Sequence, residues 1–181
     1  GIFLVAESTD SSGVPDNRLQ CPAGQGIHFI PIQDPDAPQD PTMPDGLDLS
    51  GLRLFYSTGE ARTLRLSISP DKKELLLYAQ EDGKLTLSVI DAVTGELLQC
   101  LDLLEDAGTQ YIQLIETDAL HLAITEEDRF SLVSKEGGRY AQVLSGQMGM
   151  TEEEERAVRL GGGRQMLAWD GRRMALASAW Q

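Results

Sequence analysis

The sequence has few of the residues on which most catalytic and metal sites are built. It contains two histidines and two cysteines among 181 residues. Metal centres and Ser-His triads need several ligands or partners held close together. His28 and His121 both fall in apolar segments that we expect to be strands, so we interpret them as strand residues. We predict no catalytic residue and no cofactor.

The two cysteines exclude a metal-binding cysteine motif and a disulfide-rich scaffold. Cys21 and Cys100 are far apart in the chain, outside the spacings typical of metal sites. They could form one disulfide in an oxidising compartment, or remain two separate thiols. The second alternative is favoured, because nothing else in the sequence resembles a disulfide scaffold.

Positive charge and long apolar runs are also scarce. The chain has 15 basic residues against 29 acidic ones, for a net charge of −14. Such a field repels phosphate groups, so we expect neither a nucleic acid partner nor attraction to anionic membranes. No apolar run approaches the roughly 18 residues that would cross a bilayer. The acidic surface favours solubility, or attraction of cations or of a basic partner.

Aromatic residues make up only 6% of the chain, whereas hydrophobic residues make up 41%. The core is therefore expected to consist mainly of Leu, Ile, Val and Ala. A chain of this length can bury such a core in one domain. We predict a single domain over residues 1–181.

What the chain does contain is a recurring turn centred on aspartate. Asp71, Asp118 and Asp170 each stand between two apolar segments, at intervals of about 50 residues, which is typical of propeller blades. The flanking segments alternate apolar and polar residues, as half-buried strands do. This pattern predicts four antiparallel strands in residues 63–103, four more in 109–145, and a half blade of two strands in 164–181.

Two motifs resemble known repeats. Ile68–Leu76 resembles the Ser-Pro-Asp-Gly-Lys turn of TolB-like and WD-repeat-like β-propeller blades, and Ala168–Ala175 is similar to it. Asp91–Glu96 looks like the Asp-x-x-Thr-Gly-Glu turn before the outer strand of a blade. Lys72 stands where the pattern usually has glycine. The resemblance implies an all-β fold of antiparallel, four-stranded, propeller-like blades. The array is either incomplete or circularly closed, with the C-terminal strands pairing with strands at 27–32 and 52–57.

Two segments depart from the blade pattern. Residues 1–50 are irregular apart from short strand candidates, and they contain an Asp- and Pro-rich stretch. Oxygen-rich loops suit Ca²⁺, so this stretch is either a solvated loop or a metal site whose candidate ligands are Asp34, Asp36, Asp40, Asp45 and Asp48. Residues 151–160 predict one short helix, with Thr151 and Glu154 forming a capping box and Gly161–Gly163 ending it.

These observations favour a non-catalytic module that binds a protein or another ligand on propeller-like blades. The alternative is a fragment of a secreted hydrolase that processes carbohydrates or peptides with acidic catalytic residues. We expect a protein partner or a homodimer, because short arrays of strands leave sheet edges uncovered. The apolar N-terminal residues, which look like a trimmed end, and the acidic surface favour a location outside the cytoplasm.

Overall fold

The computed structural model describes residues 2–6, 26–30, 52–105, 108–149, 151, 153, 156 and 164–179. The regular elements in these residues are β-strands, apart from Glu153 and Arg156, which are helical. The described part of the chain is therefore all-β, as predicted. The chain divides into two compact units, Gly1–Thr63 and Leu64–Gln181. The single domain over residues 1–181 stays a prediction.

The first unit contains an antiparallel sheet with the order β1 (Ile2–Ala6), β2 (Gly26–Ile30) and β3 (Arg53–Ser57). The rings of Phe3, Phe29 and Phe55, one from each strand, have centroids 5.0–6.2 Å apart, within the range in which aromatic rings attract one another. Gly26 is required where β2 approaches β3, because a Cβ atom there would overlap the Tyr56 carbonyl oxygen. The sequence had predicted a strand in each of these three short segments.

The next four strands form what we call the first sheet, in the order β4 (Arg62–Ile68), β5 (Glu74–Glu81), β6 (Lys84–Asp91) and β7 (Leu97–Leu104). The blade predicted at 63–103 is thus a four-stranded antiparallel sheet. Its β5–β6 hairpin turns at Asp82 and Gly83, with φ of 50° and 76°. Positive φ at both central residues is the type I′ geometry that an Asp-Gly pair predicts.

The second sheet repeats this layout, with β8 (Ile112–Glu116), β9 (Leu120–Thr125), β10 (Arg129–Glu136) and β11 (Arg139–Gln147) in sequence order. It confirms the four strands predicted in 109–145. A two-stranded hairpin then follows, formed by β12 (Arg164–Trp169) and β13 (Met174–Ala179). The C-terminal segment is therefore strand rather than helix, although Met174–Ala177 consists of good helix formers.

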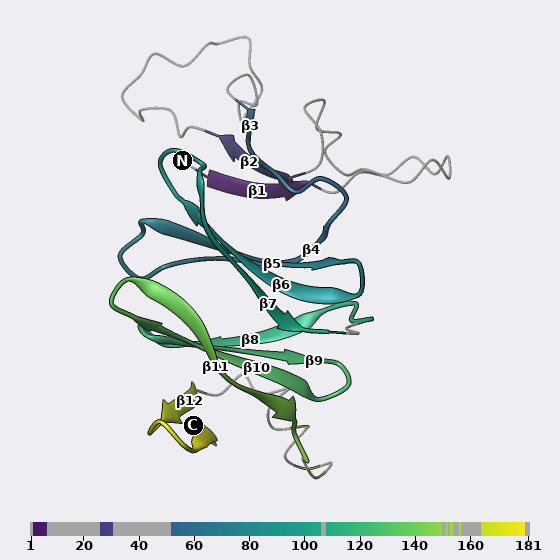
Figure 1. Ribbon diagram of the computed structural model, residues 1–181, viewed down its shortest axis with the longest axis vertical. Coiled ribbons are helices and arrows are strands. Elements are labelled where there is room, and N and C mark those ends of the chain that lie inside the picture. Colours follow the sequence, from purple (N-terminus) through teal and green to yellow (C-terminus); the bar gives the residue numbers. More distant parts are fainter. Residues whose placement is uncertain are drawn as a thin grey trace, which may run out of the picture. The chain divides into compact units, whose positions relative to one another are not determined.

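The first and second sheets lie face to face (Figure 1), with apolar side chains packed between them. Between the first and second sheets, Leu76, Tyr78 and Leu87 pack with Ala123 and Val133 and are at most 1% exposed. On its other face the second sheet packs against the hairpin through a cluster that includes Leu122, Leu132, Leu167, Trp169 and Leu176. Full burial of an aliphatic side chain contributes about 1.5–3 kcal/mol, so this packing is the main force that stacks the sheets.

Two parts of the expected architecture stay predictions. Closure of the blades into a ring is one of them. Most of the helix expected at 151–160 lies outside the described residues, and so do Gly161–Gly163 beyond it.

In the part of the chain that the structure describes, no helix is long and apolar enough to cross a membrane.

Candidate functional site

Three aspartates each close a turn by accepting two hydrogen bonds on one carboxylate oxygen. Asp71 Oδ1 accepts hydrogen bonds from Ser69 Oγ at 2.7 Å and from the Lys73 amide at 3.2 Å. The Ser69 bond, followed by the Lys73 amide, holds the pKa of Asp71 below its ordinary value of 3.8. Asp91 and Asp170 each accept two backbone amides at 2.7–2.8 Å, which lower the pKa of both carboxyls. These aspartates therefore stabilise turns.

The turn at Asp118 differs from the predicted pattern. There the Thr117 hydroxyl accepts the Leu120 amide at 3.0 Å, and the Thr117 amide donates to the Leu120 carbonyl at 2.8 Å. The residue that closes this turn is thus Thr117, because its short hydroxyl side chain reaches the same amide as the aspartate does elsewhere. The strands on either side of this turn lie where they were predicted, and only the residue that closes the turn was misassigned.

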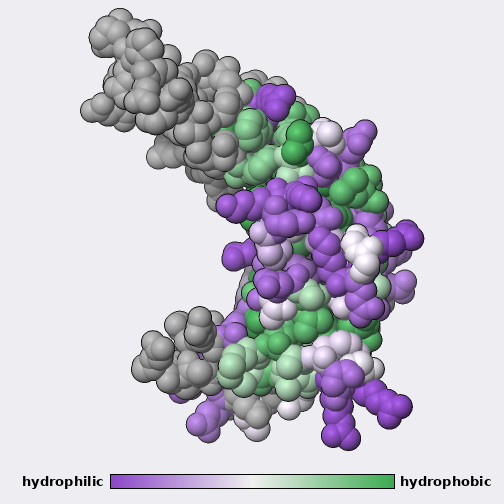
Figure 2. Space-filling model, turned by 90° about the vertical axis from the view of Figure 1, so that its left-hand side faces the viewer, coloured by the Kyte–Doolittle hydropathy of each residue, from purple (hydrophilic) through white to green (hydrophobic). Residues whose placement is uncertain are grey.

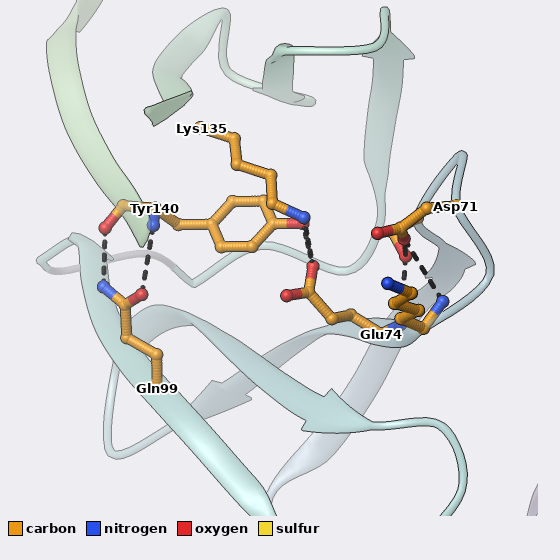
Figure 3. A network of polar contacts seen from close by, with 7 residues as sticks. Asp71, Glu74, Gln99, Lys135 and Tyr140 are labelled. Atoms are coloured by element: carbon orange, nitrogen blue, oxygen red, sulfur yellow. Dashed lines mark hydrogen bonds and ion pairs between the residues drawn. The ribbon is translucent and has the colours of Figure 1, made fainter. Parts of the chain in front are cut away.

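A group of polar side chains in contact lies between the first and second sheets (Figure 3). Glu74 on β5 accepts a hydrogen bond from Tyr140 Oη and an ion-pair contact from Lys135 Nζ, both at 2.6 Å and both on Oε2. The side chains of Glu74 and Lys135 are only 15% and 18% exposed. Tyr140 and Lys135 belong to β11 and β10, so Glu74 joins the two sheets.

Two glutamines extend this group along the same junction. The Gln99 amide on β7 donates to the Tyr140 carbonyl and accepts the Tyr140 backbone amide. Gln142 on β11 donates to the Leu103 carbonyl of β7 and to Ser131 Oγ. A side-chain amide has both a donor and an acceptor, so it can satisfy backbone groups that no neighbouring strand pairs.

Glu116 forms the third connection between the sheets. Its Oε1 accepts a hydrogen bond from Ser67 Oγ on β4 at 2.8 Å and lies 2.9 Å from His121 Nδ1 on β9. The His121 residue is 2% exposed, and its ring centroid is 5.5 Å from that of Tyr140. We call these residues the intersheet cluster, defined as Ser67, Glu74, Gln99, Glu116, His121, Lys135, Tyr140 and Gln142.

Burial controls the acid-base behaviour of two tyrosines at this junction. Burial, and then the nearby charges of Glu116 and Tyr140, raise the pKa of Tyr78 well above its ordinary value of 10.0. Burial, and then the hydrogen bond to Glu74, raise the pKa of Tyr140 in the same direction. Both phenols therefore stay protonated at neutral pH, where they can donate hydrogen bonds but cannot act as bases.

Two atoms near this junction make no hydrogen bond within the described residues. They are Tyr78 Oη and His121 Nε2, and both are buried. A buried polar atom without a partner costs about 1–3 kcal/mol. Hydrogen bonding at the junction is thus incomplete. The Tyr140 hydroxyl has an acceptor, whereas the Tyr78 hydroxyl, in the same core, has none among these residues.

The sequence had predicted none of these cluster contacts. His28 and His121 lie on strands β2 and β9, as predicted, but both are fully buried, whereas the sequence had favoured a surface or half-buried position. The metal candidates Asp34, Asp36, Asp40, Asp45 and Asp48 lie outside the described residues, as does Cys21, while Cys100 is exposed with a free thiol. In the described ranges, no three His, Cys, Asp or Glu residues are grouped as metal ligands would be.

Comparisons of the chain with protein-family models, with curated proteins and with solved structures find no match. The resemblance to propeller blades therefore rests on the turn motifs and stays a prediction.

Proposed function

We propose that this chain is a non-catalytic module that binds a protein or another ligand, with its stacked sheets serving as a rigid support. The order of contacts around Glu116 carries the proposal. In a catalytic triad the histidine stands between serine and carboxylate, so that it can take the serine proton. Here the carboxylate stands in the middle, because Ser67 and His121 both contact Glu116 Oε1. His121 therefore does not activate Ser67.

The rest of the intersheet cluster supports the same proposal. Glu74 Oε2 is occupied by Lys135 and Tyr140, and the amide of Gln99 is occupied by the backbone of Tyr140. Groups that are saturated by contacts within the fold do not present a nucleophile, a base and an oxyanion site to a substrate. Their effect is to fix one sheet against the other, which keeps loops and strand edges in place for binding.

The first test is a screen for turnover. The full chain and the variants Glu116→Gln and His121→Ala are incubated with fluorogenic esters, peptides and glycosides. We expect no turnover above buffer for any of the three proteins. Turnover that either substitution abolishes would reject the proposal in favour of the hydrolase alternative.

The second test measures binding. The labelled full chain is applied to arrays of peptides and glycans, and hits are titrated in solution. We expect saturable binding that is unchanged in Glu116→Gln, provided that circular dichroism shows the same fold, because the Glu116 carboxylate is engaged by Ser67 and His121 at the junction between the sheets. Absence of saturable binding across the arrays would count against a binding module.

A further inference from the structure

A β-bulge on strand β7 exposes two adjacent leucines. In the pairing of β6 with β7, Ile90 is opposite Leu97 and Val89 is opposite Gln99, so Leu98 is the extra residue. A bulge bends its strand and redirects the side chains beside it. Leu97 and Leu98 are 50% and 53% exposed as a result, and Val93, in the turn that leads into β7, is 81% exposed. We call Val93, Leu97 and Leu98 the bulge patch.

Among the described residues, Val93, Leu97 and Leu98 belong to neither of the two hydrophobic core clusters. β7 is the last strand of the first sheet, and its hydrogen bonds to the second sheet come from Gln99 and Leu103, beyond the bulge. Edge strands of monomeric proteins are usually protected by charges, prolines or short length. Here the edge strand presents Leu97 and Leu98, and the turn before it presents Val93; such a cluster of exposed aliphatic residues is typical of an interaction surface.

The charge of the chain decides between the candidate partners. A second copy would carry the same net charge of −14, and like charges disfavour association. The patch is also bordered by Asp91 and Glu96 at the ends of its turn, whose backbone groups bond to each other. The pKa of Asp91 is held low by the amides of Thr94 and Val93, so this carboxylate is ionised at neutral pH. A partner that carries positive charge beside its apolar contact residues is therefore favoured.

We propose that the bulge patch docks a cationic, amphipathic segment of another protein, whose apolar side chains cover Leu97, Leu98 and Val93 while its Lys or Arg residues lie near the surrounding carboxylates. This inference rests on the proposed binding function and names the surface and the partner chemistry. On the face drawn in Figure 2, exposed hydrophobic areas are bordered by hydrophilic side chains.

The experiment uses the full chain and three synthetic dye-labelled peptides of equal length and leucine content, with positive, zero or negative net charge. Fluorescence anisotropy gives the dissociation constant of each. We expect the cationic peptide to bind most tightly, and its affinity to fall as NaCl is raised, because salt screens charges at exposed sites. The double variant Leu97→Ser/Leu98→Ser is expected to bind it at least tenfold more weakly, which corresponds to about 1.4 kcal/mol.

Two further variants make the result specific. Met166→Ser is the matched control, since Met166 is 58% exposed but lies on β12, and we expect its affinity to equal that of the wild type. Val93→Ser removes the apolar side chain that the turn contributes to the patch and leaves β7 unaltered. It should weaken binding, and it keeps the test available if the double variant fails to fold. Equal affinity of all variants for the cationic peptide would overturn the docking surface while leaving a binding module in place.

The remaining outcomes are also decisive. Tightest binding of the neutral or anionic peptide, or no binding of any of the three, would overturn the partner chemistry. Light scattering that gives a dimer mass for the wild type and a monomer mass for Leu97→Ser/Leu98→Ser would replace the cationic partner with a second copy. The proposed function itself is tested separately, by the turnover screen and by the arrays.

Discussion

The same substitution, tyrosine to phenylalanine, is expected to have opposite effects at two positions in one core. Tyr78 and Tyr140 are both buried between the first and second sheets, with exposures of 0% and 2%. Tyr140 Oη donates to the Glu74 carboxylate at 2.6 Å, whereas Tyr78 Oη has no partner among the described residues. Each change removes one oxygen and leaves the ring in place, so the difference between the variants isolates the hydrogen bond.

The magnitudes follow from these contacts. A hydrogen bond to a charged group is worth about 1.5–3 kcal/mol net, and Glu74 keeps Lys135 as its other partner in Tyr140→Phe. We therefore expect Tyr140→Phe to lower the free energy of unfolding by about 2 kcal/mol, or to lower Tm by roughly 4–8 °C for a chain of this size. Tyr78→Phe removes a buried hydroxyl that makes no bond, and should be neutral or stabilising by up to about 1 kcal/mol.

The assay is urea unfolding followed by intrinsic fluorescence and by circular dichroism, with coincident transitions required before a free energy is derived. Equal m-values for the wild type and both variants would show that the comparison concerns the folded state. Equal losses of unfolding free energy in both variants would refute the reasoning. They would mean that the hydrogen-bonded hydroxyl of Tyr140 contributes no more than the unbonded hydroxyl of Tyr78. A large loss in Tyr78→Phe alone would show that its hydroxyl has a partner and that the junction is satisfied differently.

Three further predictions concern turns and titration. Lys72 has φ of 60°, so Lys72→Gly should relieve about 1–2 kcal/mol of left-handed strain against about 0.5–1 kcal/mol of lost chain entropy. Its thermal stability should therefore equal or exceed that of the wild type, whereas Lys73→Gly, where no positive φ is relieved, should lower it. Because the pKa of Asp170 is depressed by the amides of Arg173 and Arg172, its charge stabilises the fold above pH 3.8 and this contribution disappears as pH falls further. Asp170→Asn should thus unfold at a lower temperature than the wild type at pH 7, and the gap should close in acid; a gap independent of pH would contradict this. Burial raises the pKa of Tyr78 and of Tyr140 above 10.0, so stability should fall as pH rises past 10, and absorbance at 295 nm should show these tyrosines ionising only on unfolding, not in the native baseline.

Local features of the fold were largely predictable from the sequence. The turn at Asp82 and Gly83 requires positive φ at both residues, which an Asp-Gly pair adopts at low cost, so the hairpin could be placed without knowledge of its surroundings. Alternation of apolar and polar residues similarly identified β4 and β6, because side chains in a strand alternate between two faces, whereas β5 was identified as an inner strand because it is apolar on both faces. The turn at Thr117 was misassigned for an equally local reason, since Thr and Asp side chains close turns in similar ways and the aspartate was the more conspicuous residue.

The intersheet cluster could not be predicted in this way, since its members are distant in sequence. Glu74 contacts Lys135 and Tyr140, and Ser67 contacts Glu116, but strand periodicity states only which face a side chain occupies, not which strand of another sheet lies opposite. The bulge at Leu98 was hidden for a related reason, because it depends on the register between β6 and β7, and two consecutive leucines in a strand are compatible with either face. The sequence by itself determined the all-β class, the turns and most strand positions, which depend on backbone conformation and short-range patterning. Only the tertiary structure decided which sheets face each other and which polar groups are satisfied, because those outcomes depend on packing between residues that the chain brings together from far apart.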